Sequence, residues 1–247
     1  MMNYQASKDL LKDKIILVTG AGDGIGKTAA IHYAKHGATV ILLGRTTKKL
    51  EQVYDEIENA GYPQAAIVPL NLDGAVEHDY SQLASTIEKE FGRLDGLLHN
   101  ASILGDRTAL ATYEPSTFEQ VMRVNVTSQF LLTQAVMPLL NQSETASIVF
   151  TSSGVGRKAR AYWGAYAISK FATEAMMQLL AEELENTSNI RVNAINPGAT
   201  RTNMRAHAFP AENPESNATP EEIMPTYLYL MGKDSLHVNG ESIDAQA

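Results

Sequence analysis

Cysteine is absent from this 247-residue chain, tryptophan occurs only once, and basic residues are outnumbered by acidic ones, which leaves a net charge of −8. The lack of cysteine excludes disulfides, thiolate metal sites and a cysteine nucleophile. The negative charge argues against nonspecific binding to nucleic acid or to an anionic membrane. We therefore expect neither of these as a partner.

Long apolar runs are also missing. A membrane-spanning helix needs about 20 predominantly apolar residues, and no stretch of the chain approaches that length. Residues 1–13, MMNYQASKDLLKD, lack the apolar segment of a signal peptide. The expected location is the cytoplasm.

What the chain does contain is a regular alternation of apolar runs and helical patterns. With 44% hydrophobic residues, it is large enough for one well-packed domain. The apolar runs predict strands at residues 15–18, 39–43, 66–70, 94–99, 147–151 and 191–196. Helical patterns begin near residue 24 and recur at residues 46–61, 76–91, 115–140 and 162–184. This alternation implies right-handed crossovers and a parallel sheet with helices on both faces, so we predict a single doubly wound α/β domain over residues 1–247.

Residues 203–222 depart from this alternation, because they contain three prolines and few apolar positions. A long irregular segment inside a compact domain is usually a functional lid or a disordered loop. This one follows the carboxyl end of a predicted strand, where open α/β sheets bind ligands. We expect an irregular substrate lid.

A glycine-rich turn follows the first strand. Gly20, Gly22, Gly24 and Gly26 lie within seven residues, between the strand at 15–18 and a helical pattern. Such a turn lets backbone N–H groups and a helix N-terminus approach a phosphate that side chains would block. We interpret it as a phosphate-binding loop of the dinucleotide type.

The same letters nearly match the P-loop of ATPases and GTPases. Gly26-Lys27-Thr28 ends that motif correctly, but its first glycine falls on Ala21. A P-loop protein would also place a Mg²⁺-binding aspartate after a later apolar strand, whereas residues 147–153 end in hydroxyls.

The end of the second predicted strand bears on the choice of cofactor. NAD-binding folds place an acidic residue about 20 residues after the glycines, but residues 43–49 read LGRTTKK. Arg45 offers a planar partner for a 2′-phosphate. The alternative is a solvated basic start of a helix. Because a helix N-terminus normally favours acids, we predict NADP rather than NAD.

Tyr166 and Lys170 are four residues apart, so on a helix they share one face. A lysine cation about 4 Å from the phenol would bring its pKa from about 10 toward about 7, with desolvation opposing this. The tyrosine would then suit a proton donor for a carbonyl. Ser153, at the end of the strand at 147–151, could orient that carbonyl; it or Ser152 could instead cap the following turn.

Taken in order, these pieces resemble the short-chain dehydrogenase/reductase family over nearly the full length. They are Thr19-Gly20-x-x-x-Gly24-Ile25-Gly26, Asn100-Ala101, Asn125, Ser153, Tyr166-x-x-x-Lys170, and Asn196-Pro197-Gly198 followed by Thr202. The resemblance implies a Rossmann fold with a parallel sheet of seven strands, and hydride transfer between NADP(H) and a carbonyl or alcohol. It also implies a homodimer or homotetramer, built on the helices at 115–140 and 163–184.

The resemblance further implies roles for individual residues. Tyr166 would be the general acid and base, and Lys170 would lower the pKa of Tyr166 and bind the nicotinamide ribose. Ser153 would position the carbonyl, and Asn125 would hold a water that supplies protons. The implied cofactor site, with Arg45 included, consists of Gly20, Asp23, Gly24, Ile25, Gly26, Arg45, Asn71, Leu72, Asn100, Ala101, Tyr166, Lys170, Pro197, Gly198, Thr200 and Thr202.

Some positions depart from the family pattern. The usual Asn-Asn-Ala-Gly appears as His99-Asn100-Ala101-Ser102. Asn71 replaces the usual acid after the third strand, and the glycine pair near the C-terminus is missing. The last departure puts the final strand in doubt. A catalytically silent NADP-binding sensor is a further alternative, which the four intact catalytic positions disfavour.

Two other features receive ordinary interpretations. His32 and His36 could share a metal, but no third ligand accompanies them, so we predict no metal site. The basic run Arg157, Lys158 and Arg160 is expected to be a solvated loop rather than a clamp for an anionic substrate.

Overall fold

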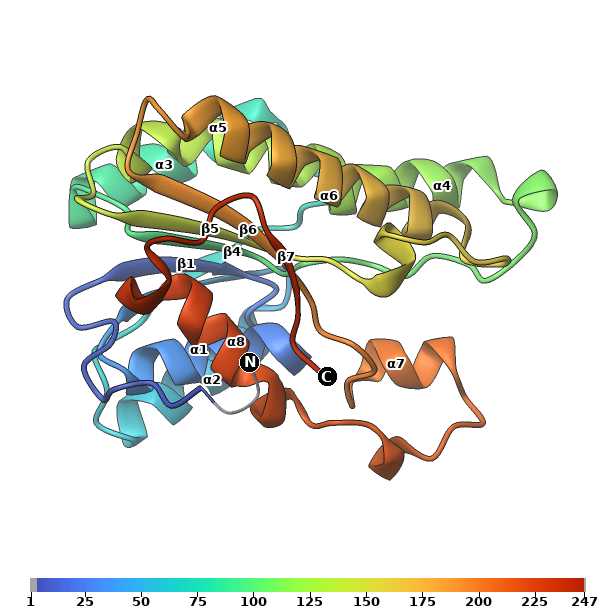
Figure 1. The fold of residues 1–247 in the computed structure, drawn as a ribbon, viewed down its shortest axis with the longest axis horizontal. Coiled ribbons are helices and arrows are strands. Elements are labelled where there is room, and N and C mark those ends of the chain that lie inside the picture. Colours follow the sequence, from blue (N-terminus) through green and yellow to red (C-terminus); the bar gives the residue numbers. More distant parts are fainter. Residues whose placement is uncertain (1–3, 247) are drawn as a thin grey trace.

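The computed structural model describes residues 4–246, and within them seven strands form one sheet. The strand order is β3-β2-β1-β4-β5-β6-β7, and every neighbouring pair is parallel (Figure 1). The strands are β1 (Ile15–Thr19), β2 (Thr39–Gly44), β3 (Ala66–Pro69), β4 (Gly96–His99), β5 (Ala146–Thr151), β6 (Ile190–Asn196) and β7 (Ser242–Asp244). The predicted doubly wound fold is confirmed.

Helices cover both faces of this sheet (Figure 1). One face carries α1 (Gly24–Lys35), α2 (Thr47–Asn59) and α8 (Pro220–Met231). The other carries α3 (Glu77–Phe91), α4 (Pro115–Met122), α5 (Ser128–Leu140) and α6 (Gly164–Leu184). Each face of the sheet therefore has its own apolar core.

β1 lies in the middle of the sheet, between β2 and β4. From β1 the chain first builds outward through β2 to β3, and then crosses back to build outward from β4 to β7. The loops that leave β1 and β4 consequently diverge at the carboxyl edge of the sheet. Open α/β sheets bind their ligands in the crevice at this point.

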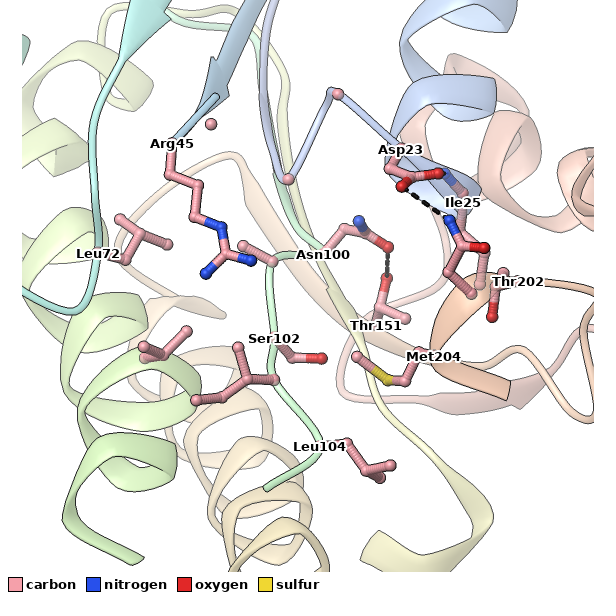
Figure 2. A pocket seen from close by; sticks show the side chains of 18 of the residues that line it. Asp23, Ile25, Arg45, Leu72, Asn100, Ser102, Leu104, Thr151, Thr202 and Met204 are labelled. Carbon is pink, nitrogen blue, oxygen red and sulfur yellow. Dashed lines mark hydrogen bonds between the residues drawn. The ribbon is translucent and has the colours of Figure 1, made fainter. Parts of the chain in front are cut away.

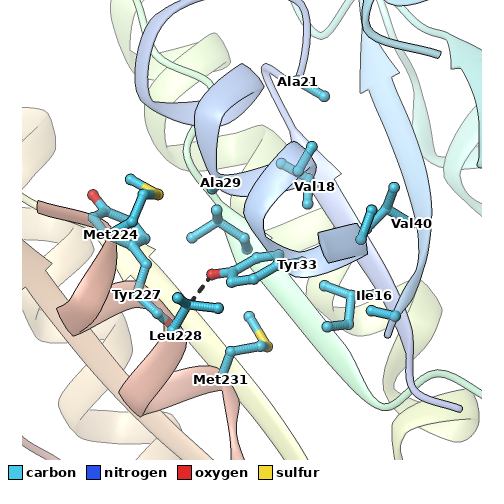
Figure 3. Packing of buried hydrophobic residues seen from close by; sticks show 14 of the residues in the cluster. Ile16, Val18, Ala21, Ala29, Tyr33, Val40, Met224, Tyr227, Leu228 and Met231 are labelled. Carbon is cyan, nitrogen blue, oxygen red and sulfur yellow. Dashed lines mark hydrogen bonds between the residues drawn. The ribbon is translucent and has the colours of Figure 1, made fainter. Parts of the chain in front are cut away.

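A buried tyrosine fastens α1 and α8 to the sheet. Tyr33 of α1 is fully buried, and Figure 3 shows its ring packed between Val18 of β1 and Leu228 of α8. Its hydroxyl donates a hydrogen bond to the backbone oxygen of Tyr227 at 3.5 Å. The glycine loop that precedes α1 is thus attached to a firmly packed helix.

The helix predicted over residues 115–140 is present, but it is not α-helical throughout. A π-helical segment, Arg123–Thr127, joins α4 to α5 and contains Asn125. Such π segments occur frequently at functional sites. The sequence pattern of this region is that of an ordinary helix, so the extra residue in the turn was not predicted.

The prediction of an irregular segment over residues 203–222 is wrong in part. Residues 203–208 form α7 (Asn203–Ala208), which begins where the Thr202 side chain accepts a hydrogen bond from the Arg205 amide. Pro220 is the first residue of α8, where Thr219 and Glu222 form a capping box. The prolines therefore mark helix starts as well as loop, because proline is well tolerated in a first helical turn.

The last strand forms without the missing glycine pair. Ala194, Ile195 and Asn196 of β6 lie beside Ser242, Ile243 and Asp244 of β7, respectively. Beyond it, the Gln246 amide donates to the backbone oxygens of Pro197 and Ala199 at 2.7 and 2.9 Å. The C-terminal segment therefore supports the loop that follows β6.

The outer faces of the long helices keep some large apolar side chains. Phe130 of α5 is 52% exposed and Phe171 of α6 is 42% exposed, whereas Phe118, Met122 and Met176 are half-buried. A homo-oligomer built on these helices remains a prediction. Of the helices in residues 4–246, none combines the length and apolarity that crossing a bilayer requires.

Candidate functional site

A cavity of about 480 Å³ opens at the carboxyl edge of the sheet (Figure 2). Its volume is typical of small-molecule and cofactor sites. All but two of the predicted site residues line it. They are Gly20, Asp23, Gly24, Ile25, Arg45, Asn71, Leu72, Asn100, Ala101, Ser153, Tyr166, Lys170, Pro197, Gly198, Thr200 and Thr202.

Gly26 is one of the two exceptions. It lies in the first turn of α1, and a Cβ atom there would overlap the backbone oxygen of Gly20 and lie 2.5 Å from the Asn100 side-chain nitrogen. Gly20 itself has a φ of +68° and meets the Ala101 backbone closely. Gly26 therefore serves close packing of α1 on the strand ends, which leaves room for a ligand at Gly20 and Gly24.

The P-loop interpretation fails on the position of its two key side chains. Lys27 forms an ion pair with Glu56 of α2 at 2.5 Å, and Thr28 of α1 is buried. Neither residue lines the cavity. A P-loop needs this lysine on the β- and γ-phosphates and this hydroxyl on Mg²⁺.

Asp23 closes the glycine loop and connects it to α7. One carboxylate oxygen accepts a hydrogen bond from the Gly24 amide at 2.8 Å. The other accepts from the Lys49 ammonium at 2.6 Å and from the Asn203 amide at 3.0 Å. The hydrogen bond from Lys49 is the main cause that lowers the pKa of Asp23, against burial. Lys49 and Asn203 were missed at the sequence level, although Lys49 belongs to the basic cluster that follows β2.

Arg45 leaves the end of β2 and points into the cavity, on the side opposite Asp23 and Thr202 (Figure 2). It forms no ion pair with any carboxylate in residues 4–246. Asn71 and Leu72, which follow β3, line the same side. This side of the cavity offers an uncompensated, planar cation to a ligand.

The loop after β4 is held against β1 by one hydroxyl. The Thr19 oxygen accepts hydrogen bonds from the amides of Asn100 and Ala101 at 2.9 and 3.1 Å, and donates to Leu98 at 3.1 Å. His99, just before this loop, is stacked on Phe150 and buried. Burial lowers the pKa of His99 to about 3, so it is a neutral packing residue.

Tyr166 and Lys170 lie on α6 with both side chains buried, 8% and 1% exposed respectively. The lysine nitrogen donates to the backbone oxygen of Thr151 at 2.8 Å and lies 5.5 Å from the centre of the tyrosine ring. Ser153 follows β5 and lines the cavity with them. The structure thus brings the three predicted side chains together.

The expected lowering of the tyrosine pKa is not found. Burial raises the pKa of Tyr166 to about 12, and the Ser153 hydroxyl acts only partly in the opposite direction. Burial also lowers the pKa of Lys170 to about 8, against the influence of Glu174. The physical reason is that both groups are removed from water, while the ammonium is directed toward a carbonyl of β5.

Asn125 is the second predicted residue that does not line the cavity. Its side chain is fully buried. The Asn125 side-chain oxygen accepts a hydrogen bond from the backbone amide of Ile103 at 2.8 Å, and its nitrogen donates to the backbone oxygen of Ile103 at 2.9 Å. It also donates to the Ser169 hydroxyl at 3.0 Å. Asn125 therefore holds the loop after β4 against Ser169 of α6.

The prediction of a solvated loop applies to only part of the basic run. Arg157 donates to Asp244 at 2.7 Å and to the Ser242 hydroxyl, so it fastens β7 to the segment after β5. Lys158 and Arg160 are exposed. No group of three or more potential metal ligands among His, Cys, Asp and Glu occurs in the part of the chain that the structure describes.

Apolar side chains at the Tyr166 side of the cavity were not predicted. Leu104, Trp163 and Met204 pack around the tyrosine and line the cavity. They come from three separate loops or short helices, in which apolar residues form no periodic pattern. No periodic signal in the sequence marked them.

Comparison with known proteins shows which family has this fold. The family model for short chain dehydrogenases matches residues 14–213. The uncharacterized oxidoreductase YciK of Escherichia coli K12 is 54% identical over 245 residues, which are 99% of this chain and 96% of that protein.

Solved structures of similar sequence have the same fold. A short chain dehydrogenase structure from Pseudomonas syringae is 59% identical, with a TM-score of 0.98 and full coverage of both chains. One from Escherichia coli CFT073, complexed with NADPH, is 55% identical with a TM-score of 0.93, and covers 98% of this chain and 100% of that one. By its sequence, its fold and these relatives, the chain belongs to the short chain dehydrogenase family of oxidoreductases.

Proposed function

We propose that the protein is an NADP(H)-dependent oxidoreductase that interconverts a carbonyl and an alcohol, with Tyr166 as the general acid and base. The observation that carries the proposal is one continuous cavity. It has a glycine loop and a free arginine at one end and the buried Tyr166, Lys170 and Ser153 at the other.

The residues present fit a dinucleotide phosphate. The close approach at Gly20 and Gly24 leaves backbone amides at the N-terminus of α1 open to a pyrophosphate. Arg45 would bind the 2′-phosphate, because a planar guanidinium forms paired hydrogen bonds to phosphate oxygens. The NADPH complex of the Escherichia coli CFT073 relative supports the same preference.

A bound NADPH would supply the hydride for reduction of the carbonyl. The Ser153 hydroxyl would hold the carbonyl oxygen, and Tyr166 would give its phenolic proton to that oxygen as the alcohol forms. Because the pKa of Tyr166 is about 12, the phenol carries its proton at neutral pH and is ready to act as the acid. The Lys170 ammonium would then stabilise the phenolate that remains.

Asn125 would contribute indirectly. Its hydrogen bonds to Ile103 and Ser169 join the loop after β4 to the helix that carries Tyr166 and Lys170. We propose that it fixes the distance between these elements; a water bound near it, as the family resemblance implies, would have to use its backbone.

The test is NADPH consumption with a panel of aldehydes and ketones. Replacing Tyr166 by Phe should lower the rate about 100-fold or more, the usual contribution of a general acid, while NADPH binding stays within about twofold because the phenyl ring keeps the packing. Tyr162→Phe is the matched control, since Tyr162 is 61% exposed and does not line the cavity.

Equal rates in Tyr166→Phe and the wild type would remove Tyr166 from the mechanism. A wild-type protein that binds NADPH but consumes none with any carbonyl would instead favour a silent NADP sensor. Failure to bind NADPH at all would contradict both.

A further inference from the structure

The Tyr166 end of the cavity is apolar. Val155, Tyr166 and Ala167 form a small buried cluster, against which Leu104, Trp163 and Met204 pack. Figure 2 shows Leu104 and Met204 near one another at this end. A carbonyl held at Tyr166 would therefore have apolar side chains on its flanks.

The wall formed by Trp163 is held in place by a cation. The Arg107 guanidinium carbon lies 4.4 Å from the centre of the Trp163 ring and 4.8 Å from the centre of the Phe209 ring. Arg107 also donates a hydrogen bond to the backbone oxygen of Ala208. We refer to Arg107, Trp163 and Phe209 as the aromatic clamp.

The aromatic clamp joins three segments that are distant in the sequence. Arg107 belongs to the loop after β4, Trp163 precedes α6, and Phe209 follows α7. The Trp163 ring lies 5.8 Å from the Tyr166 ring and 5.9 Å from the Phe209 ring, measured between centroids. The position of the indole beside the tyrosine thus depends on the guanidinium that covers it.

The two arginines near this end are already occupied. Arg205, which lines the cavity, donates to both carboxylate oxygens of Glu212, at 2.5 and 2.6 Å. Arg107 does not itself line the cavity and is occupied by the two rings and by Ala208. The Lys170 ammonium donates to the backbone oxygen of Thr151. A carboxylate placed against Leu104, Trp163 and Met204 would therefore meet apolar walls and lose its hydration without a free cation as partner.

We propose that Arg107 is a positioning residue that holds Trp163 against Tyr166, and that the subsite so formed selects uncharged carbonyl compounds with an apolar group beside the carbonyl. The inference rests on the proposed oxidoreductase function for its chemistry. It goes beyond that function by assigning the substrate class and the residue that maintains the selective wall.

Trp163 is the only tryptophan of the chain, so its fluorescence reports directly on the aromatic clamp. Arg107→Ala should uncover the indole, which increases quenching by acrylamide and shifts the emission to longer wavelength. Arg160→Ala is the matched control, because Arg160 is an exposed arginine three residues from Trp163 in the same loop and outside the cavity lining. Identical quenching in the two variants would overturn the role of Arg107.

The substrate class is tested with two probes of the same shape. 4-Phenyl-2-butanone and 2-oxo-4-phenylbutanoate differ only in a methyl group against a carboxylate. With NADP⁺ present, which prevents reduction, the ketone should protect Trp163 from acrylamide and the oxo acid should not. Equal or stronger protection by the oxo acid would overturn the proposed selectivity.

Turnover of the ketone with NADPH provides the second readout. Arg107→Ala should raise KM about fivefold, the scale of one cation–π contact, with a smaller change in kcat and none in NADPH affinity. Arg160→Ala should leave all three unchanged, and an equal KM in both variants would count against the proposal. If the ketone protects Trp163 but is not reduced, the oxidoreductase proposal fails while the apolar subsite stands.

Discussion

The two ends of the cavity are built in different ways. At the cofactor end, the protein contributes mainly backbone and charge: close-packed glycines, the start of α1, and the exposed Arg45. At the Tyr166 end it contributes stacked side chains, among them Trp163 and Met204, carried by segments that meet only in the folded chain.

This difference has a structural consequence. At the cofactor end, the glycine loop belongs to one strand–loop–helix unit, whose helix α1 is fixed by the packing of Tyr33. The Tyr166 end depends on contacts between loops, such as the aromatic clamp. A substitution in the close-packed glycine loop should therefore affect the whole domain, whereas one at the Tyr166 end should mainly change which substrate fits.

The largest effect is expected at Gly26. Alanine there should destabilise the fold by about 3 kcal/mol and lower the melting temperature by about 6 °C or more, because its Cβ would overlap the Gly20 backbone oxygen. Alanine is the better helix former by about 1 kcal/mol, so a loss of stability would isolate the packing effect. Thermal unfolding and NADPH titration measure it.

Gly74→Ala is the control for this experiment. Gly74 lies near Asn71 at the same end of the cavity, and a Cβ atom there would meet nothing within 4 Å. If both alanine variants unfold at the same temperature as the wild type, close packing at Gly26 is not required and the comparison between the two ends loses its basis.

Arg45→Ala should have the next largest effect, and this effect should be confined to cofactor binding. Loss of charge-assisted hydrogen bonds to a 2′-phosphate should weaken NADPH binding about tenfold or more, while NADH, which lacks that phosphate, should bind nearly as before. Fluorescence titration with both cofactors measures the ratio.

Lys48→Ala removes a neighbouring cation that is exposed and does not line the cavity, and should change neither affinity. A parallel loss of NADPH and NADH affinity in Arg45→Ala would mean that Arg45 acts on binding in general rather than on the 2′-phosphate.

The difference between the two ends of the cavity also explains which features could be predicted from the sequence. The strands and the glycine turn were predictable because apolar runs and glycine spacing are local signals. Gly26 was predicted as a cofactor contact from its spacing. The folded chain places Gly20 and Asn100 against it, and it does not line the cavity. Only the packing of the folded chain distinguishes a glycine that contacts a ligand from one that packs against other residues.

Around Tyr166, sequence reasoning identified the groups but not their environment. The i, i+4 spacing correctly put Tyr166 and Lys170 on one helix face, yet the sign of the tyrosine pKa shift depends on burial by loops that have no periodic pattern. The side chain of Asn125 is likewise committed to Ile103, a contact between residues 22 positions apart that spacing does not reveal.

The smallest effect is expected at Glu174, which does not line the cavity. This buried carboxylate lies one helical turn after Lys170, accepts hydrogen bonds from Ser152 and from Ser242, and lies 3.6 Å from the Arg157 guanidinium. Burial lowers the pKa of Lys170 to about 8, and the negative charge of Glu174 opposes this lowering.

Carbonyl reduction should therefore slow as the pH rises through about 8, because Lys170 loses its proton there and the phenolate of Tyr166 loses its counter-ion. Glu174→Gln removes the carboxylate and leaves the Arg157 cation, so Lys170 should lose its proton more easily and the decline should move to lower pH. Rates of NADPH consumption across pH 6 to 10 measure the shift, with Glu182→Gln, an exposed carboxylate on the same helix, as the control. A decline that stays at the same pH in all three proteins would mean that Glu174 only fastens β5 to β7, and that the charge of Lys170 is set by burial alone.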